Sequence, residues 1–197
     1  MKDYSAGLTS QLFWLQEARK TASLMVEGKD RSAIKEIAWS ENIYQVGAEY
    51  RAVEVLNATY RRISKLPEPV ISHFATCDSE VAKVINLIAV MMDSRILFEF
   101  MREVYARKIR LGEKELIDRD LSEFFTDKAE QSETVAGWTE VATNKLKQSI
   151  TRMLFEADLI ENSKRPAPIR HARVDYRTED LLKKNGLDEY LKAITGE

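Results

Sequence analysis

The chain contains few of the residues that stabilise small proteins through covalent links or metals. Its 197 residues include one cysteine, Cys77, and two histidines, His73 and His171. A single cysteine excludes a disulfide framework within the chain and suits a reducing compartment. No HxxxH or CxxC spacing places a second ligand beside either histidine, so we expect no metal site. We expect Cys77 to be a buried structural thiol and His73 a surface or capping residue.

Clustered glycines and long apolar runs are also missing. The seven glycines are isolated, and without a glycine-rich loop to hold phosphates a nucleotide-hydrolysing motor is excluded. The longest nearly apolar run, residues 84–92, is interrupted by Asn86 and is too short for a membrane-spanning helix, which needs roughly 20 residues. The first residues lack the apolar core of a secretory signal. We therefore expect a cytoplasmic protein that does not enter a membrane.

Neither sign of charge dominates the composition. The chain has 30 Lys and Arg against 32 Asp and Glu, and it is 44% hydrophobic and 31% charged, as is typical of soluble globular proteins. This balance excludes a uniformly basic coat for nucleic acid but can hide a local basic patch. Glu99, Glu103 and Glu130 could be gathered by folding, yet no histidine is paired with them. We expect a protein that is not an enzyme and needs no cofactor.

Helical spacing of apolar residues accounts for most of the chain. The clearest examples are residues 8–25, 47–66, 78–92 and 96–105, of which the last two are apolar enough to be enclosed by other helices. The pattern predicts an all-α, multi-helix bundle with an N-terminal lobe at 1–112 and a C-terminal lobe at 113–197, if the two are not one continuous domain. The only plausible strands, at 159–160 and 169–174, could pair as a small hairpin or wing.

The strongest functional pattern lies within residues 118–176. A short amphipathic helix, a turn at 134–139 and a longer helix at 140–157 precede a basic, proline-interrupted segment at 162–173, here called the basic flap. This order is that of a winged helix-turn-helix nucleic-acid module. Many helical proteins also carry a loop after a helix. The side chains on the second helix and on the flap therefore have to distinguish a nucleic-acid module from an ordinary helix followed by a loop.

A helical wheel divides the helix at 140–157 into an apolar and a polar face. The face expected to meet the core holds Ala142, Leu146, Ile150, Met153 and Ala157. The opposite face offers amide and hydroxyl groups for base edges, from Asn144, Gln148 and Thr151. Cations on its two flanks, which could meet phosphate oxygens, are Lys145, Lys147 and Arg152. Phe155 also lies on the outward side, which a groove-reading helix does not explain.

The basic flap would extend this surface. Its candidate phosphate contacts are Lys164, Arg165, Arg170 and Arg173. The alternative is an ordinary solvated helix face beside a basic surface loop. Residues 113–133 hold eight acidic and three basic residues, whereas residues 145–173 hold seven basic and three acidic ones. Nucleic-acid contact would therefore be one-sided, or the acidic helix faces a partner protein.

A second basic cluster lies near the end of the helix at 47–66. Arg61, Arg62 and Lys65 are explained by solvation of a helix end, although they could extend a nucleic-acid track if the two lobes pack side by side.

Several segments resemble the BrxA family. They are Tyr-Ser-Ala-Gly-Leu-Thr at 4–9, Leu-Phe-Glu-Phe-Met at 97–101 and Leu-Phe-Glu-Ala-Asp-Leu at 154–159, with shorter matches at 85–87, 124–125, 130–132 and Trp138. Their order and spacing match over nearly the full chain. BrxA is a small accessory component of BREX, a bacterial phage-defence system that marks host DNA by methylation and blocks phage DNA replication. The resemblance implies an all-helical core similar to the NusB antitermination fold, no enzymatic activity and binding to double-stranded DNA.

The sequence thus favours a non-enzymatic, sequence-tolerant protein that binds double-stranded DNA in a BREX system. The other BREX proteins implied as partners are a methyltransferase, a phosphatase-like protein, an ATPase and a Lon-like protease. One alternative is a protein-interaction adaptor that assembles these components, suggested by the acidic helix and the near-neutral net charge. RNA binding is a third possibility, which rests on the analogy with the NusB-like fold alone.

Overall fold

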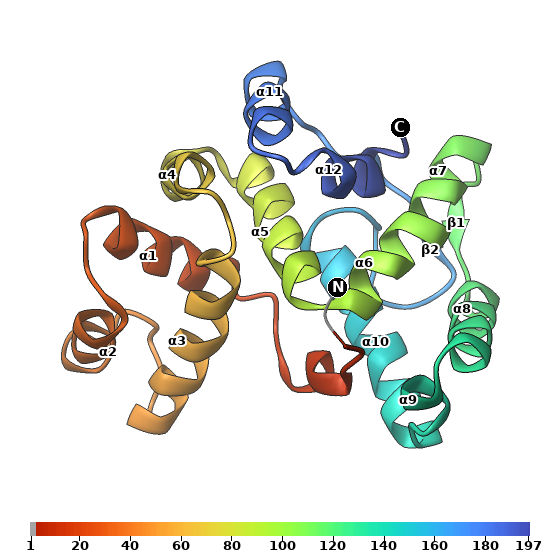
Figure 1. Cartoon of the computed structure of the whole chain (residues 1–197), viewed down its shortest axis with the longest axis horizontal. Helices are drawn as coiled ribbons and strands as arrows, with labels where there is room; N and C mark the ends of the chain where they lie inside the picture. The colour runs from red at the N-terminus through yellow and green to blue at the C-terminus, as the bar shows by residue number, and fades with distance from the viewer. Residues whose placement is uncertain (1–2) are drawn as a thin grey trace. The chain divides into compact units, whose positions relative to one another are not determined.

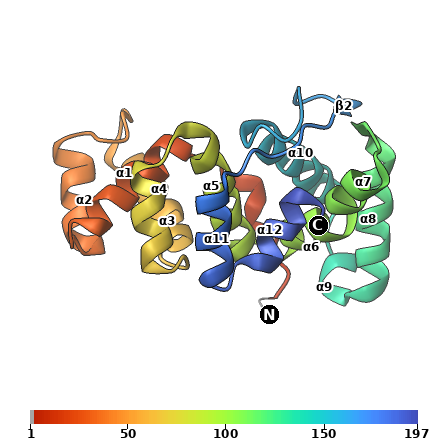
Figure 2. The same ribbon diagram turned by 90° about the horizontal axis from the view of Figure 1, so that it is seen from above.

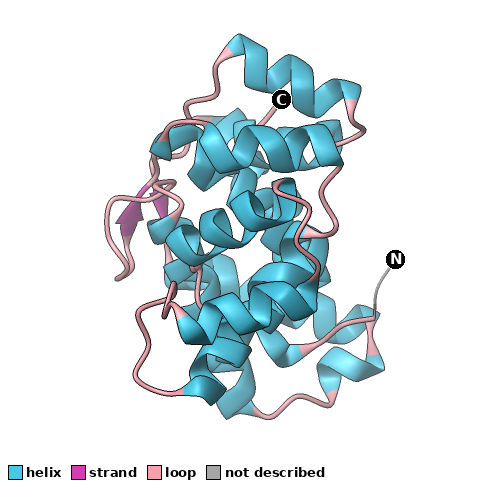
Figure 3. Cartoon of the chain, turned by 90° about the vertical axis from the view of Figure 1, so that its left-hand side faces the viewer, coloured by secondary structure: helices cyan, strands magenta, loops and turns pink. Residues whose placement is uncertain are grey.

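Helices make up nearly all of the regular structure in a computed structural model that describes residues 3–197 (Figures 1 and 3), which confirms the all-α prediction. The chain divides into two compact units. Unit 1 contains the N-terminal segment to Phe13, Ser94–Arg173 and Gly186–Glu197, and unit 2 contains Trp14–Asp93 and Val174–Asn185. These units do not follow the boundary expected after Gly112, because both cross it in sequence.

Unit 2 is built from six helices of the described chain. They are α1 (Leu15–Val26), α2 (Arg31–Ser40), α3 (Glu49–Ile63), α4 (Glu68–Thr76), α5 (Ser79–Asp93) and α11 (Tyr176–Lys184). Helix α1 packs against α3, α4 and α5, while α2 packs on α3 and α11 on α4. The buried position expected for residues 78–92 is confirmed: Ile85, Leu87 and Ile88 of α5 are fully inaccessible to solvent.

The first long helix begins later than its apolar spacing predicted. Residues Ala6–Ser10 form a short 3₁₀ helix, η1, in unit 1, and α1 starts only at Leu15. Trp14 interrupts the helical path because its backbone is left-handed, with φ of 49°. Leu12 therefore leaves the predicted apolar stripe and is exposed.

Unit 1 carries the remaining elements. Its helical elements are η1, α6 (Arg95–Phe100), the π-helical turn η2 (Met101–Tyr105), α7 (Ala106–Leu111), α8 (Asp118–Gln131), α9 (Glu133–Ala136), α10 (Glu140–Glu156) and α12 (Asp188–Thr195). The expected turn at 134–139 thus contains a short helix, α9. Helix α10 matches the helix predicted at 140–157, and Thr139 caps its first turn by accepting a hydrogen bond from the Ala142 amide.

The predicted hairpin forms only as one bridge, between Ile160 and Ile169. The two-stranded antiparallel sheet instead pairs β1 (Glu115–Leu116) with β2 (Ala167–Pro168). Strand β1 has only two residues, too few to show the alternation of apolar and polar side chains that marks a strand. The sequence therefore did not indicate this pairing. The Tyr105 hydroxyl donates to the carbonyl oxygens of Leu159 and Arg170, at 3.2 and 2.6 Å, and so closes the base of the basic flap.

A buried charge cluster fixes α8 against α6 and η2. The ammonium of Lys128 lies 2.9 Å from a carboxylate oxygen of Glu99 and 2.8 Å from one of Glu103. Glu99 also accepts hydrogen bonds from the Tyr4 hydroxyl at 2.7 Å and from Arg95 Nε at 2.8 Å. The side chains of Lys128 and Glu99 are each only 4% exposed. Because a buried charge needs such partners, the cluster determines where the acidic helix lies.

No helix within residues 3–197 combines the length and the apolar character needed to cross a membrane.

Candidate nucleic-acid interface

Helix α10 presents one polar stripe to solvent. Its apolar face is buried as predicted, with Leu146 and Ile150 fully inaccessible. The exposed polar positions are Glu140 in the first turn, followed by Asn144, Lys145, Gln148 and Arg152. Val141 and Phe155, 64% and 42% exposed, lie at its two ends. The stripe therefore offers amides and cations in its middle and an apolar side chain at each end.

Thr151 is not part of this stripe, contrary to the helical wheel. Its side chain is buried, and its hydroxyl donates to the Lys147 carbonyl oxygen at 2.8 Å and accepts from Arg165 Nη1. The wheel placed Thr151 beside the polar face, but the basic flap covers that side of α10. Thr151 is therefore unable to reach a base edge in this structure.

Arg165 fastens the basic flap to the rest of unit 1. Its Nε donates to Asp118 at the start of α8, at 2.6 Å, and Nη1 also lies 3.5 Å from the Lys147 carbonyl oxygen. Only 14% of its side chain is exposed. Arg165 was predicted to contact phosphate, but its guanidinium is occupied by these internal contacts. Figure 2 shows α10 and β2 at the same edge of the unit, as this connection requires.

The other predicted cations differ in how firmly they are held. Lys145 and Lys164 are exposed, and the part of the chain that the structure describes holds no ion pair for either. Arg152 pairs with Glu156 at 2.6 Å. Arg170 pairs with Asp158 at 2.6 Å. Exposed pairs of this kind contribute little to stability, so they can be exchanged for a phosphate contact.

Lys147 and Arg173, also predicted to contact DNA, lie at the edges of the stripe and the flap. Lys147 is half-buried and donates to the Ser122 hydroxyl at 3.1 Å, which turns it towards α8 and away from the stripe. Arg173 is exposed at the end of the basic flap. Of the ten residues predicted to contact DNA, the stripe and the flap therefore present seven to solvent: Asn144, Lys145, Gln148, Arg152, Lys164, Arg170 and Arg173.

Arg165→Ala tests the fastening of the basic flap. The variant loses charge-assisted hydrogen bonds, each worth about 1.5–3 kcal/mol when largely buried. We expect the backbone amides of residues 162–165 to exchange hydrogen faster by at least tenfold, measured by mass spectrometry. The neighbouring Lys164→Ala is the matched control, because the side chain of Lys164 makes no hydrogen bond or ion pair within residues 3–197, and it should leave exchange unchanged. Equal exchange in both variants would show that Arg165 does not hold the flap.

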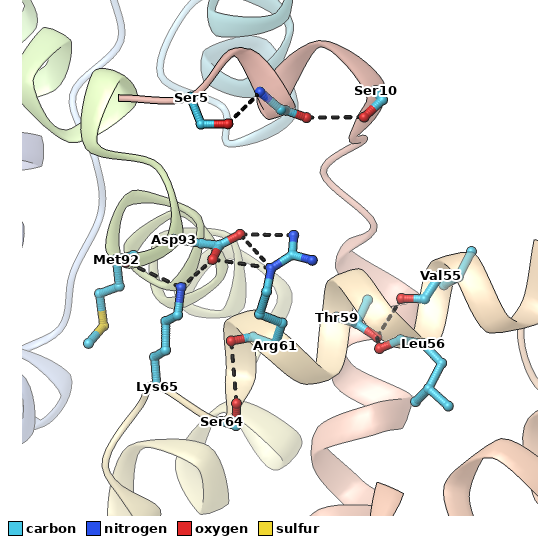
Figure 4. Close-up of polar contacts among 11 residues, drawn as sticks. Ser5, Ser10, Val55, Leu56, Thr59, Arg61, Ser64, Lys65, Met92 and Asp93 are labelled. Carbon is cyan, nitrogen blue, oxygen red and sulfur yellow. Dashed lines mark hydrogen bonds and ion pairs between the residues drawn. The ribbon is translucent and has the colours of Figure 1, made fainter. Parts of the chain in front are cut away.

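The second basic cluster of the sequence is not a solvated helix end. Arg62 is 1% exposed, with its guanidinium 5.7 Å from the centre of the Trp14 ring, and burial lowers its pKa to about 10. Arg61 and Lys65 both contact the carboxylate of Asp93 (Figure 4), and Arg61 does so at 3.0 Å. Asp93 therefore neutralises this end of α3 instead of capping the next helix. Two of the three cations already have a carboxylate partner, so we do not include the cluster in the interface.

His73 and Cys77, the histidine and the cysteine of unit 2, have surroundings that fit a structural role. His73 Nε2 lies 2.9 Å from the Thr178 hydroxyl, which joins α4 to α11. Cys77 is half-buried, less than predicted, and its burial raises the pKa of the thiol. A raised pKa leaves less of the reactive thiolate at neutral pH, which fits the structural role that was expected.

The comparison with known proteins comes from sequence and from structure. A sequence model of the BrxA family matches residues 2–186. The "BREX protein BrxA" of Bacillus cereus (strain H3081.97) is 34% identical over 194 residues, which cover 98% of this chain and 97% of the relative. An uncharacterized protein from Magnetospirillum magneticum, known from its crystal structure, superposes with a TM-score of 0.82 over the whole of both chains. At 18% identity, that likeness shows the fold alone.

Proposed function

The chain belongs to the BrxA family, and on that basis we propose that it serves a BREX phage-defence system as a non-enzymatic accessory protein that binds double-stranded DNA. The observation that carries the proposal is the exposed stripe of α10 with the basic flap held against the same helix by Arg165. Such a surface offers cations to phosphates and amides to the bases between them.

Phosphate contacts supply most of the affinity in this proposal. The five cations on the solvent side are Lys145, Arg152, Lys164, Arg170 and Arg173. Each neutralised phosphate contributes roughly 0.9 to the slope of log affinity against log salt, so five predict a slope of about −4.5. Only Asn144 and Gln148 remain to read bases, because Thr151 is buried. The interface should therefore tolerate many DNA sequences.

Competition between nucleic acids tests the proposal. A labelled DNA duplex bound by the protein should be displaced equally well, within about threefold, by two unlabelled duplexes of the same length and unrelated sequence. Duplex RNA should compete less well, because the narrow major groove of A-form RNA does not admit a helix such as α10. If structured RNA displaces the DNA more readily than DNA itself does, RNA is the ligand. Absence of any salt-sensitive DNA binding removes the proposal.

A further inference from the structure

A groove that adjoins the polar stripe of α10 has a different chemistry from the stripe. It lies between α8, α9 and α10 of unit 1 and has a volume of ≈ 660 Å³. Its apolar lining consists of Phe125, Ala129, Val135, Ala136 and Trp138. Figure 1 shows these three helices following one another at one side of the unit. The volume is within the range of sites that accept side chains or small ligands.

Trp138 is the feature that marks the groove as a docking surface. It is half-buried, and its ring packs against Phe125 with centroids 6.4 Å apart and planes tilted by 57°. Val135, which also lines the groove, is buried. A tryptophan held on one side and open to solvent on the other is the kind of residue around which protein interfaces concentrate their binding energy.

The carboxylates around the groove are without ionic partners. Glu130 and Glu140 line it together with one cation, Lys147, which donates to the Ser122 hydroxyl, and Asp127 and Glu133 are exposed on α8 and α9. None of these four carboxylates forms an ion pair within residues 3–197, whereas Glu123, one turn earlier on α8, is paired with Arg119 at 2.6 Å. Carboxylates at this density repel phosphate, so the groove does not suit nucleic acid. They attract a cationic ligand instead.

We propose that this groove binds a basic segment of a partner protein, which inserts an apolar side chain against Trp138 and Phe125 and places Lys or Arg side chains near Glu130 and Glu140. The electrostatic complementarity selects the partner and speeds its association, and the aromatic floor retains it. The inference does not rest on DNA binding: the groove adjoins the polar stripe at Asn144, but its aromatic floor and its carboxylates are not among the residues proposed to contact DNA.

Synthetic peptides probe the groove directly. We would titrate the ¹⁵N-labelled protein with a panel of short peptides that each carry one or two Leu, Phe or Trp residues flanked by Lys and Arg. Two matched peptide sets replace the cationic residues by Glu or the apolar residues by Ser. We expect members of the first set to bind and to shift the indole N–H resonance of Trp138, while neither matched set binds.

Variants of the groove separate docking from nonspecific attraction. Glu130→Lys with Glu140→Lys should weaken the best peptide at least about tenfold, because like charges then face each other. Glu115→Lys with Glu189→Lys is the control for the same change in net charge, since both residues are exposed in the same unit and neither lines the groove. Trp138→Ala should weaken binding further, and circular dichroism verifies that each variant folds. All of these variants should bind duplex DNA at least as well as the unmodified protein.

The outcomes decide the proposal. Failure of every basic apolar peptide to bind overturns it, and so does binding that survives the Glu130 and Glu140 substitutions. Self-association that Trp138→Ala abolishes would assign the groove to a second copy of this chain. If the Glu130→Lys and Glu140→Lys variant loses DNA binding and keeps peptide binding, the groove binds nucleic acid and the peptide proposal is wrong. A failure of DNA binding alone leaves the groove proposal standing, so the two inferences can fail separately.

Discussion

Lys128→Met is expected to lower the free energy of unfolding by about 3–5 kcal/mol, the typical cost of removing one partner from a buried ion pair. The ammonium of Lys128 contacts Glu99 and Glu103, and both Lys128 and Glu99 are almost inaccessible to solvent. Without the ammonium, the buried carboxylate of Glu99 keeps only Arg95 and Tyr4. Urea denaturation followed by circular dichroism measures the loss.

The matched control is Lys192→Met, which removes the same charge from α12. Lys192 pairs with Asp188 one turn earlier, and both side chains are nearly half exposed, at 49% and 41%. Exposed pairs of this spacing contribute about 0.3–0.5 kcal/mol. A loss in Lys128→Met no greater than that in Lys192→Met would contradict the structural role of the cluster. Glu99→Gln combined with Lys128→Met should recover part of the loss, because no charge is then left unpaired at Glu99.

The same cluster sets a pH dependence on the acid side. Burial by itself would raise the pKa of Glu99, but hydrogen bonds from Arg95, Lys128 and Tyr4 outweigh it and lower the pKa. A lowered folded pKa means that the ionised carboxylate stabilises the protein above its unfolded pKa, about 4.3 for Glu. This contribution is lost as pH falls through the folded pKa. The stability difference between the unmodified protein and Glu99→Gln should therefore shrink below pH ~4.3.

Substituting Lys145, Arg152 and Lys164 together by Ala is expected to flatten the salt dependence of DNA binding. Each of the three cations is exposed on the stripe or the flap. At roughly 0.9 per neutralised phosphate, the log–log slope should become less steep by about 2.7. A fluorescence anisotropy titration of labelled duplex at several salt concentrations gives the slope. All three side chains are exposed, so stability should change by less than about 1 kcal/mol.

A second triple variant controls for the lost charge. Lys29, Lys35 and Lys184 are also exposed, and they belong to unit 2, whereas α10 belongs to unit 1. Their replacement by Ala removes the same total charge and should leave the slope within about 0.5 of the unmodified protein. An equal flattening by both triple variants would mean that only net charge matters, and it would remove the assigned interface.

Local pattern predicted the helices of this protein well, because apolar spacing reports which face of a helix is buried. The inward face of α10 and the enclosed helix α5 were predicted for this reason and are confirmed. Where one residue changes the backbone, the pattern misleads: Trp14 adopts a left-handed conformation, and α1 starts only at Leu15, well inside the apolar stripe predicted at 8–25.

Contacts between distant segments account for most of what the sequence did not show. Thr151 is buried by Arg165, which is 14 positions further along the chain. Tyr4 and Glu99 are 95 positions apart, and no spacing rule connects them to Lys128. The groove lined by Trp138 likewise needs three helices to form. The local composition did give one signal. The concentration of acidic residues in 113–133 suggested a partner protein, but it did not indicate where that partner would bind.

The position of duplex DNA on the protein can be measured by lysine footprinting. The protein is acetylated with and without excess duplex DNA at low salt, and the reactivity of each lysine is quantified by mass spectrometry. The proposed interface predicts that Lys145 and Lys164 become at least about fivefold less reactive with DNA, as expected for ammonium groups engaged by phosphates. Lys29, Lys35 and Lys184 should keep their reactivity. Unchanged reactivity of Lys145 and Lys164 in the DNA complex, or protection confined to lysines elsewhere, would contradict DNA binding by α10 and the basic flap.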